Sequence, residues 1–182
     1  MLSTEEKIAI VNYRRQKSHE SLNEAKEVIK LGFWSLAGNR LYYAAFHMAS
    51  ALLLDKGITA RSHSGVIHLI GAQFVTKGLL EKEYGRLFSR LFEMRQSGDY
   101  DDMYDATEEE ILPLIDKTVM FISKIRPHLP HNLDSHHYAI EYSHTCIERT
   151  HEGIRLVGCR SKGGKYFACS SCHGFFLSMD LI

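Results

Sequence analysis

The sequence has no long apolar run and no excess of charge of either sign. No apolar stretch approaches the roughly 20 residues that a membrane-spanning helix needs. The 22 basic and 22 acidic side chains give a formal net charge of zero, which excludes a strongly basic nucleic-acid-binding coat but permits a local basic patch. The first ten residues, MLSTEEKIAI, lack the basic start and apolar stretch of a secretory signal, so we expect a cytoplasmic protein.

Cysteine is absent from residues 1–127, which also hold only four of the eleven histidines. Residues 128–182 hold all four cysteines and the other seven histidines. Hydrophobic residues make up 45% of the chain, which is typical of a globular protein. We therefore expect a helical domain over residues 1–127, followed by a Cys/His-rich extension of uncertain structure over residues 128–182.

Residues 1–127 lack the alternating pattern of β-strands and follow helical periodicity instead. Capping boxes at Ser3–Glu6 and Thr107–Glu110 mark two helix starts, and Ser62 or Ser64 can cap another. Pro113 indicates that the last helix either starts there or kinks. Glycines 32, 57, 78 and 98 mark helix ends. Because the connections are short, we predict an all-α, up-and-down bundle of about five helices, over roughly residues 4–30, 33–56, 63–77, 81–97 and 107–125.

The second predicted helix carries both a core stripe and a polar row. Leu41, Ala45, Met48 and Leu52 recur at the helical spacing of a buried stripe. Arg40, Tyr43 and His47 lie on another side of the same helix. An arginine, a phenol and an imidazole in one row can hold a phosphate, stack on a base and move a proton. The alternative is structural: Arg40 pairs with a carboxylate of the first or fourth helix.

Two further segments carry groups suited to a phosphate. Arg61 and His63 lie beside two serines at the start of the third helix, where free backbone donors suit an anion, although ordinary capping by those serines also accounts for them. Arg95, Asp99 and Tyr100 lie near the end of the fourth helix. Arg95 there either binds a phosphate or pairs with Asp99.

The extension contains one metal-binding spacing, Cys169-x-x-Cys172. Cys146, Cys159, His144 and His173 are available to complete four ligands. A zinc-dependent interaction module is therefore one hypothesis, although a zinc ribbon usually has two such pairs; apart from this zinc we expect no cofactor. The alternative is a loosely ordered extension, in which Ser135–Glu152 can form a helix and Ile154–Cys159 can pair with Tyr166–Cys169 as a hairpin.

Three segments together resemble the HEPN domain family, in its small stand-alone prokaryotic branch. They are NRLYYAAFHMASALLLDKGITARSHSGVI, QFVTKGLL and FEMRQSGDYDD, and the resemblance covers residues 1–126. It implies an all-α bundle that forms homodimers and binds nucleotide or RNA. It also implies a minimal nucleotidyltransferase partner in a toxin–antitoxin system. The nucleotide-binding residues would be Arg40, Tyr43, Arg61, His63, Arg95, Asp99 and Tyr100.

The resemblance also implies an alternative function, that of a metal-independent endoribonuclease. Its motif is an arginine, four to six residues and then a histidine, and Arg40 with His47 fits this spacing. His47 would act as general base on a ribose 2′-hydroxyl, and Arg40 would stabilise the phosphorane charge. The same spacing also occurs in the pairs Arg14/His19, Arg61/His68 and Arg126/His131.

Overall fold

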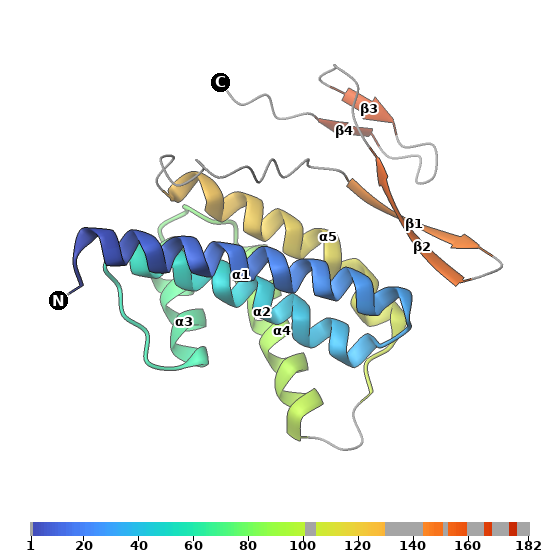
Figure 1. The fold of residues 1–182 in the computed structure, drawn as a ribbon, viewed down its shortest axis with the longest axis horizontal. Helices are drawn as coiled ribbons and strands as arrows, with labels where there is room; N and C mark the ends of the chain where they lie inside the picture. Colours follow the sequence, from blue (N-terminus) through green and yellow to red (C-terminus); the bar gives the residue numbers. More distant parts are fainter. Residues whose placement is uncertain are drawn as a thin grey trace. The chain divides into compact units, whose positions relative to one another are not determined.

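The computed structural model describes residues 2–100 and 105–129, and four strand segments between residues 144 and 177. The chain divides into two compact units, Met1–His136 and His137–Ile182, and each is described by itself. The first unit contains the helices of the described chain, and the second contains its strands (Figure 1).

The first unit is an all-α bundle with five α-helices among its described residues, which confirms the predicted fold class. The helices are α1 (Thr4–Lys30), α2 (Trp34–Asp55), α3 (His63–Ile70), α4 (Lys82–Tyr100) and α5 (Glu108–Ile125). A π-helical turn, η1 (Gly71–Val75), follows α3, and a 3₁₀ turn, η2 (Arg126–His128), follows α5. Helices α1 and α2 run side by side in opposite directions (Figure 1). None of the helices in the described residues is long and apolar enough to cross a membrane.

Local signals set most helix ends where the sequence predicts them. Ser3 Oγ accepts a hydrogen bond from the Glu6 amide at 3.1 Å, and a Glu6 carboxylate oxygen accepts one from the Ser3 amide at 2.7 Å. Ser62 caps α3 through the amide of Gly65 at 3.0 Å. Glycines 32, 57 and 78 follow helical segments with φ of +75°, +71° and +72°, a left-handed conformation that disfavours a Cβ.

One predicted helix end differs from the structure, and one alternative that the sequence leaves open is decided by it. Helix α4 continues past Gly98 to Tyr100, because a glycine weakens a helix by only about 1 kcal/mol and does not have to end it. Helix α5 begins at Glu108, so Pro113 lies inside it rather than at its start. A proline this close to the helix start removes one backbone hydrogen bond, while the capping interaction of the Thr107 amide with Glu110 at 3.2 Å supports the first turn.

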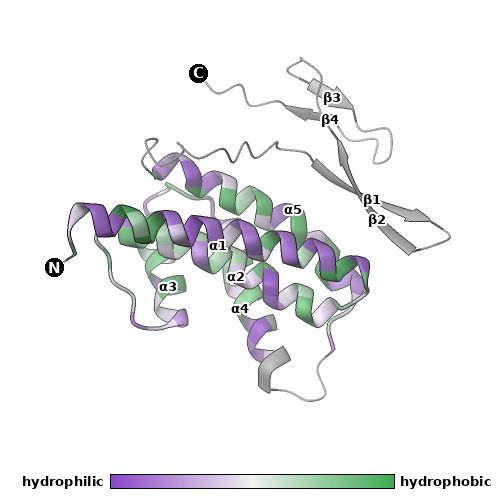
Figure 2. Cartoon of the chain, viewed as in Figure 1, coloured by the Kyte–Doolittle hydropathy of each residue, from purple (hydrophilic) through white to green (hydrophobic). Residues whose placement is uncertain are grey.

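Helix α2 lies at the centre of the bundle and packs against α1, α4 and α5. Its predicted stripe is fully or almost fully buried: Leu41, Ala45, Met48 and Leu52. Polar residues predominate on the visible face of α1, as expected for a helix with one face in solvent (Figure 2). Gly38 of α2 marks the close approach to α5, since a Cβ built there would lie 3.0 Å from Cδ1 of Ile111.

The second unit contains two antiparallel strand pairs. Strand β1 (His144–Thr150) pairs with β2 (Gly153–Cys159), and β3 (Tyr166–Ala168) pairs with β4 (Phe175–Leu177). The helix predicted over 135–152 is therefore wrong for residues 144–150, where β-branched residues favour an extended chain. The predicted hairpin is also wrong, because β2 pairs with β1 across a two-residue connection, which costs less chain entropy than the longer loop to β3.

Candidate functional site

The predicted row on α2 forms a continuous contact between Arg40, Tyr43 and His47. The Arg40 guanidinium lies over the Tyr43 ring, 5.3 Å from its centroid. The centroids of the Tyr43 and His47 rings are 6.0 Å apart, with the ring planes inclined by 31°. The structure thus brings together a cation, a phenol and an imidazole on one helix face.

Arg40 also makes the structural contact that the sequence offers as an alternative. Its Nη1 lies 3.2 Å from a carboxylate oxygen of Glu24 on α1, and its Nη2 donates to Asn39 Oδ1 at 2.8 Å. Its Nε is buried and has no hydrogen-bond partner in the described part of the chain. The side chain keeps 33% of its surface exposed, so one cationic edge remains accessible to a ligand.

His47 is a half-buried imidazole with a free acceptor position. Its Nδ1 is buried and has no hydrogen-bond partner within the described residues. Burial lowers the pKa of His47 below its ordinary value, and four nearby basic groups lower it further: Arg14, Lys17, His63 and Arg40. The ring is therefore neutral at pH 7, the form that can accept a proton.

A second aromatic cluster joins the predicted residue His63 to Tyr42 and Phe46 of α2, which the sequence did not single out. The Tyr42 hydroxyl is 2.7 Å from Nδ1 of His63, and the rings of Phe46 and His63 stack at 4.4 Å with 7° between their planes. The spacing of four residues indicates that Tyr42 and Phe46 lie on one face of α2. It does not indicate that His63 of α3 packs against them. Burial lowers the pKa of His63 and raises that of Tyr42.

Arg95 of α4 belongs to the surroundings of this cluster. Its charge lowers the pKa of both His63 and Tyr42, which places the guanidinium within electrostatic reach of both groups. Arg95 therefore lies close to the region where α2 and α3 meet, which a residue that binds a ligand there requires. Asp99 and Tyr100 are the last two residues of α4, and their side chains lie outside the described part of the structure.

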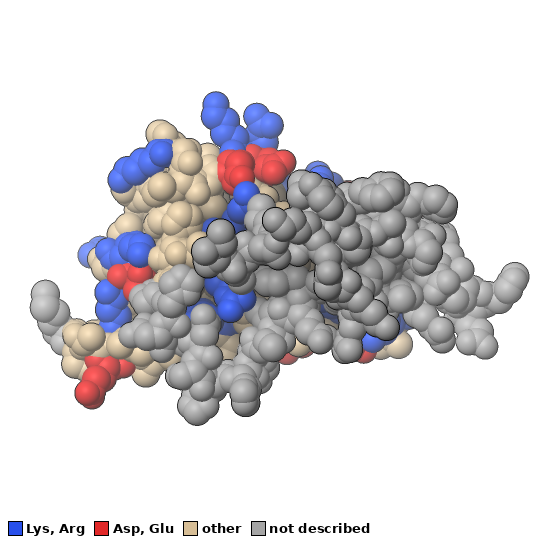
Figure 3. Space-filling view, turned by 90° about the horizontal axis from the view of Figure 1, so that it is seen from above, with Lys and Arg blue, Asp and Glu red and all other residues tan. Residues whose placement is uncertain are grey.

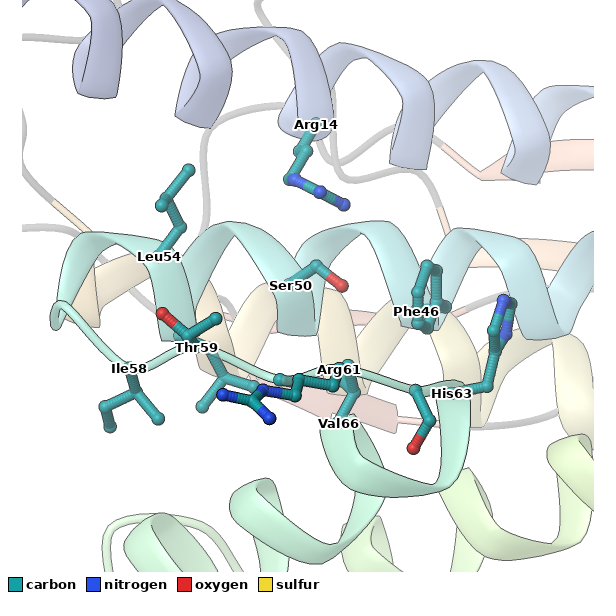
Figure 4. A pocket seen from close by; sticks show the side chains of 12 residues that line it. Arg14, Phe46, Ser50, Leu54, Ile58, Thr59, Arg61, His63 and Val66 are labelled. Atoms are coloured by element: carbon teal, nitrogen blue, oxygen red, sulfur yellow. The ribbon is translucent and has the colours of Figure 1, made fainter. Parts of the chain in front are cut away.

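A cavity of about 270 Å³ opens beside this cluster, toward the C-terminal end of α2 (Figure 4). Arg14 reaches into it from α1, and Arg61 lies on the segment that joins α2 to α3 (Figure 4). Predicted residues Arg61 and His63 line the cavity, whereas Arg40, Tyr43 and His47 do not. The full lining contains no acidic residue: Arg14, Phe46, Ser50, Leu53, Leu54, Ile58, Thr59, Ala60, Arg61, Ser62, His63 and Val66.

The charge on the visible described surface is mixed rather than of one sign, with basic and acidic side chains interspersed (Figure 3). This agrees with the zero net charge of the sequence. An anion would therefore be held by local groups, such as the acid-free lining of the cavity, and not by a field that extends over the whole protein.

The zinc hypothesis is not tested by the described residues. Cys169, Cys172 and His173 lie outside them. His144, Cys146 and Cys159 lie in β1 and β2, where His144 is in register with Cys159 and Cys146 with Val157. A search confined to the described residues finds no group of three potential metal ligands.

Comparison with known proteins gives matches over the helical unit. The model of the HEPN domain family matches residues 11–127. A protein of Thermotoga maritima named "UPF0332 protein" is 39% identical over 120 residues, which cover 66% of this chain and 91% of the relative.

Two proteins of Methanocaldococcus jannaschii carry the name "Putative toxin". One is 37% identical over 109 residues, covering 60% of this chain and 81% of the relative. The other is 30% identical over 129 residues, covering 68% and 88%. The family match covers more than half of the chain and spans the helices α2 to α5 completely, so the chain belongs to the HEPN domain family.

Proposed function

We propose that this chain is the HEPN component of a toxin–antitoxin-type system and that it binds RNA through the Arg40–Tyr43–His47 face of α2. We further propose that it forms a homodimer and works with a minimal nucleotidyltransferase partner. The names of the two archaeal relatives support the toxin role. The observation that carries RNA binding is the contiguous Arg40–Tyr43–His47 row, because each member offers a contact that single-stranded RNA uses.

The contacts of each residue in this face indicate which part of the RNA it would bind. The exposed edge of Arg40 suits a phosphate, and a base would stack on the part of the half-buried Tyr43 ring that the Arg40 guanidinium leaves uncovered. Three cationic neighbours of His47, Arg14, Lys17 and Arg40, lower its pKa, so positive side chains lie close to this face although the whole chain is neutral. Arg95 adds a further charge from α4, near His63.

Titration of a fluorescent single-stranded RNA with the full chain tests the binding role. Arg40→Ala and Tyr43→Ala should each weaken binding about tenfold, the order of one charge-assisted contact or one lost stacking surface. Arg86→Ala is the matched control, since Arg86 is an exposed arginine on α4 outside this face. Equal losses in Arg40→Ala and Arg86→Ala would mean that binding is non-specific and would contradict the proposal.

Expression in a host cell tests the toxin role. The chain expressed alone should slow growth, and co-expression of a nucleotidyltransferase encoded beside its gene should restore growth. Normal growth on expression of the soluble, folded chain would contradict the toxin role. A sedimentation experiment at several concentrations tests the homodimer, and a mass of 20.8 kDa at all of them would exclude it.

A second candidate function, RNA cleavage, is favoured by the lowered pKa of His47, because the neutral ring can accept a proton at pH 7. In this reaction His47 takes the proton of a ribose 2′-hydroxyl, the 2′-oxygen attacks the adjacent phosphorus, and the bond to the 5′-oxygen breaks. The 5′-oxygen takes a proton from water, and His47 returns its proton to the solvent. Arg40 neutralises charge on the phosphorane. The products are a 2′,3′-cyclic phosphate and a 5′-hydroxyl.

Incubation with structured and unstructured RNAs in EDTA tests this candidate. His47→Ala and Arg40→Ala should lose cleavage, while His68→Ala should keep it, because His68 has the same spacing from Arg61 but is exposed on α3. Absence of cleavage by the wild-type chain across these RNAs would exclude the activity and leave the binding role.

A further inference from the structure

We propose that the cavity lined by Arg14 and Arg61, the Arg14–Arg61 pocket, binds the terminal phosphomonoester of a nucleotide or of an RNA strand end. The phosphate would lie between the two guanidinium groups, and the adjoining base would lie against the Phe46–His63 stack. The inference rests on the proposed function: the Arg40–Tyr43–His47 face would bind the RNA strand, and the Arg14–Arg61 pocket would bind its terminal phosphate.

The charge of the pocket is the first argument. Its two arginines come from different parts of the chain, α1 and the α2–α3 segment, and its lining has no carboxylate. Within the described chain neither Arg14 nor Arg61 has an ion pair or a hydrogen bond to a side chain. Cations that face a shared cavity without a counter-charge favour an anion from outside the chain.

Hydroxyl groups supply further donors around the same space. Ser50, which is only 9% exposed, lines the pocket from α2 and makes no hydrogen bond to another described residue. Thr59 and Ser62 line it from the α2–α3 segment. In the view of Figure 4 the Ser50 side chain lies between those of Arg14 and Arg61, and all three line the pocket, so the Ser50 hydroxyl would be a further donor to a phosphate bound there.

The size of the pocket favours a strand end over the middle of a strand. Its volume of about 270 Å³ lies just below the roughly 300–1,000 Å³ of sites that enclose a drug-sized molecule. Apolar side chains, among them Leu53, Ile58 and Val66, close part of its wall. An internal phosphodiester must continue in both directions and carries one charge, whereas a terminal monoester continues in one direction and carries close to two at pH 7. Two guanidinium groups match the second kind of phosphate.

The aromatic wall indicates what is attached to the phosphate. Phe46 and His63 stack at 4.4 Å and are nearly parallel, so each covers one face of the other, and a further ring would continue the stack on an outer face at the edge of the pocket. The bond from His63 to Tyr42 holds that surface in place. A nucleobase stacks on such a surface, while an aliphatic acidic side chain gains little from it. The ligand chemistry is therefore a nucleoside phosphate rather than an acidic peptide.

Binding of matched RNA strands tests the inference. Three fluorescent eight-nucleotide RNAs of one sequence carry a 5′-phosphate, a 3′-phosphate or only hydroxyl ends. We expect one phosphorylated strand to bind about tenfold more tightly than the hydroxyl strand. Arg61→Ala and Ser50→Ala should remove this preference, so that the three strands bind each of these variants alike. Arg40→Ala should weaken all three strands equally, and Arg86→Ala should change none of them.

The outcomes separate the two proposals and the two ligand sources. If adenosine 5′-monophosphate competes as effectively as the phosphorylated strand, the ligand is a free nucleotide. If it competes more weakly than that strand, the ligand is a strand end. Equal binding of all three strands, or a preference that survives in Arg61→Ala, overturns the pocket. If the hydroxyl strand does not bind at all, calorimetry with adenosine 5′-monophosphate still tests the pocket, although the RNA-binding proposal has failed. Competition by an aspartate-rich peptide instead of the nucleotide overturns the nucleotide assignment.

Discussion

The hydroxyl of Tyr42 lies 2.7 Å from Nδ1 of His63 and joins the central helix α2 to the first residue of α3. Burial raises the pKa of Tyr42 and lowers that of His63, so both groups are neutral at pH 7. The tautomer of His63 sets the direction of this bond: with the proton on Nε2, His63 Nδ1 accepts from the Tyr42 hydroxyl. The bond fixes the start of α3 against α2, beside the face that carries Arg40, Tyr43 and His47.

Replacement of Tyr42 by phenylalanine should remove this bond and leave the ring packing intact. We expect a loss of about 1 kcal/mol in the free energy of unfolding, the usual contribution of a buried hydrogen bond, measured by urea denaturation. Tyr13→Phe is the control, because Tyr13 is 57% exposed and makes no such bond within the described residues. Equal stabilities of Tyr42→Phe and the wild type would show that the 2.7 Å contact contributes nothing.

The sequence predicted the features of the fold that depend on neighbours along the chain. Ser3, Ser62 and Gly57 end or start helices through contacts within a few residues, so their patterns are readable without a structure. The Tyr42–His63 bond joins residues 21 positions apart, and the Arg14–Arg61 pocket joins α1 to the α2–α3 segment. Such contacts depend on how helices pack, and the periodicity of one helix does not specify them.

Gly38→Ala should destabilise the protein although it replaces glycine in the interior of a helix. The new Cβ would lie 3.0 Å from Cδ1 of Ile111, which is fully buried and has little room to move. We expect a net loss of about 1 kcal/mol after the gain in helix propensity, measured by chemical denaturation. Gly71→Ala is the control: nothing lies within 4 Å of its new Cβ, so this variant should be slightly more stable than the wild type. A stabilised Gly38→Ala would mean that Ile111 moves freely.

Stability should fall as the pH is lowered from about 6.5 to 4, in part because of His19. Burial lowers the pKa of His19 to about 4, and the charges of Arg15 and Arg126 add to this effect. The unfolded chain takes up a proton near pH 6.5, whereas the folded chain does so only near pH 4, so stability is lost between these values and is unaffected by His19 below them. The lowered pKa values of His47 and His63 act in the same direction.

His19→Gln should reduce this loss by roughly 1–3 kcal/mol, measured as the difference in unfolding free energy between pH 7 and pH 4.5. His68→Gln should leave the difference as it is in the wild type, because His68 is exposed. An unchanged pH dependence in His19→Gln would contradict the assignment to that histidine.

Glu24→Gln separates the structural role of Arg40 from its role in RNA binding. The Arg40–Glu24 pair joins α1 and α2 at 3.2 Å, and the Glu24 side chain is 53% exposed. Exposed pairs contribute no more than about 1 kcal/mol, so the stability of Glu24→Gln should stay close to that of the wild type.

If Arg40 binds a phosphate, Glu24 competes for the same guanidinium, and its neutralisation should strengthen RNA binding by about twofold to fivefold. Glu27→Gln is the matched control, because Glu27 also pairs with a cation on α1, Lys30 at 2.6 Å, and lies on the same helix. Stronger binding in both variants would reflect net charge alone. If Glu24→Gln binds RNA as the wild type does and has a clearly lower free energy of unfolding, Arg40 serves to hold α1 against α2. Other residues would then bind the RNA.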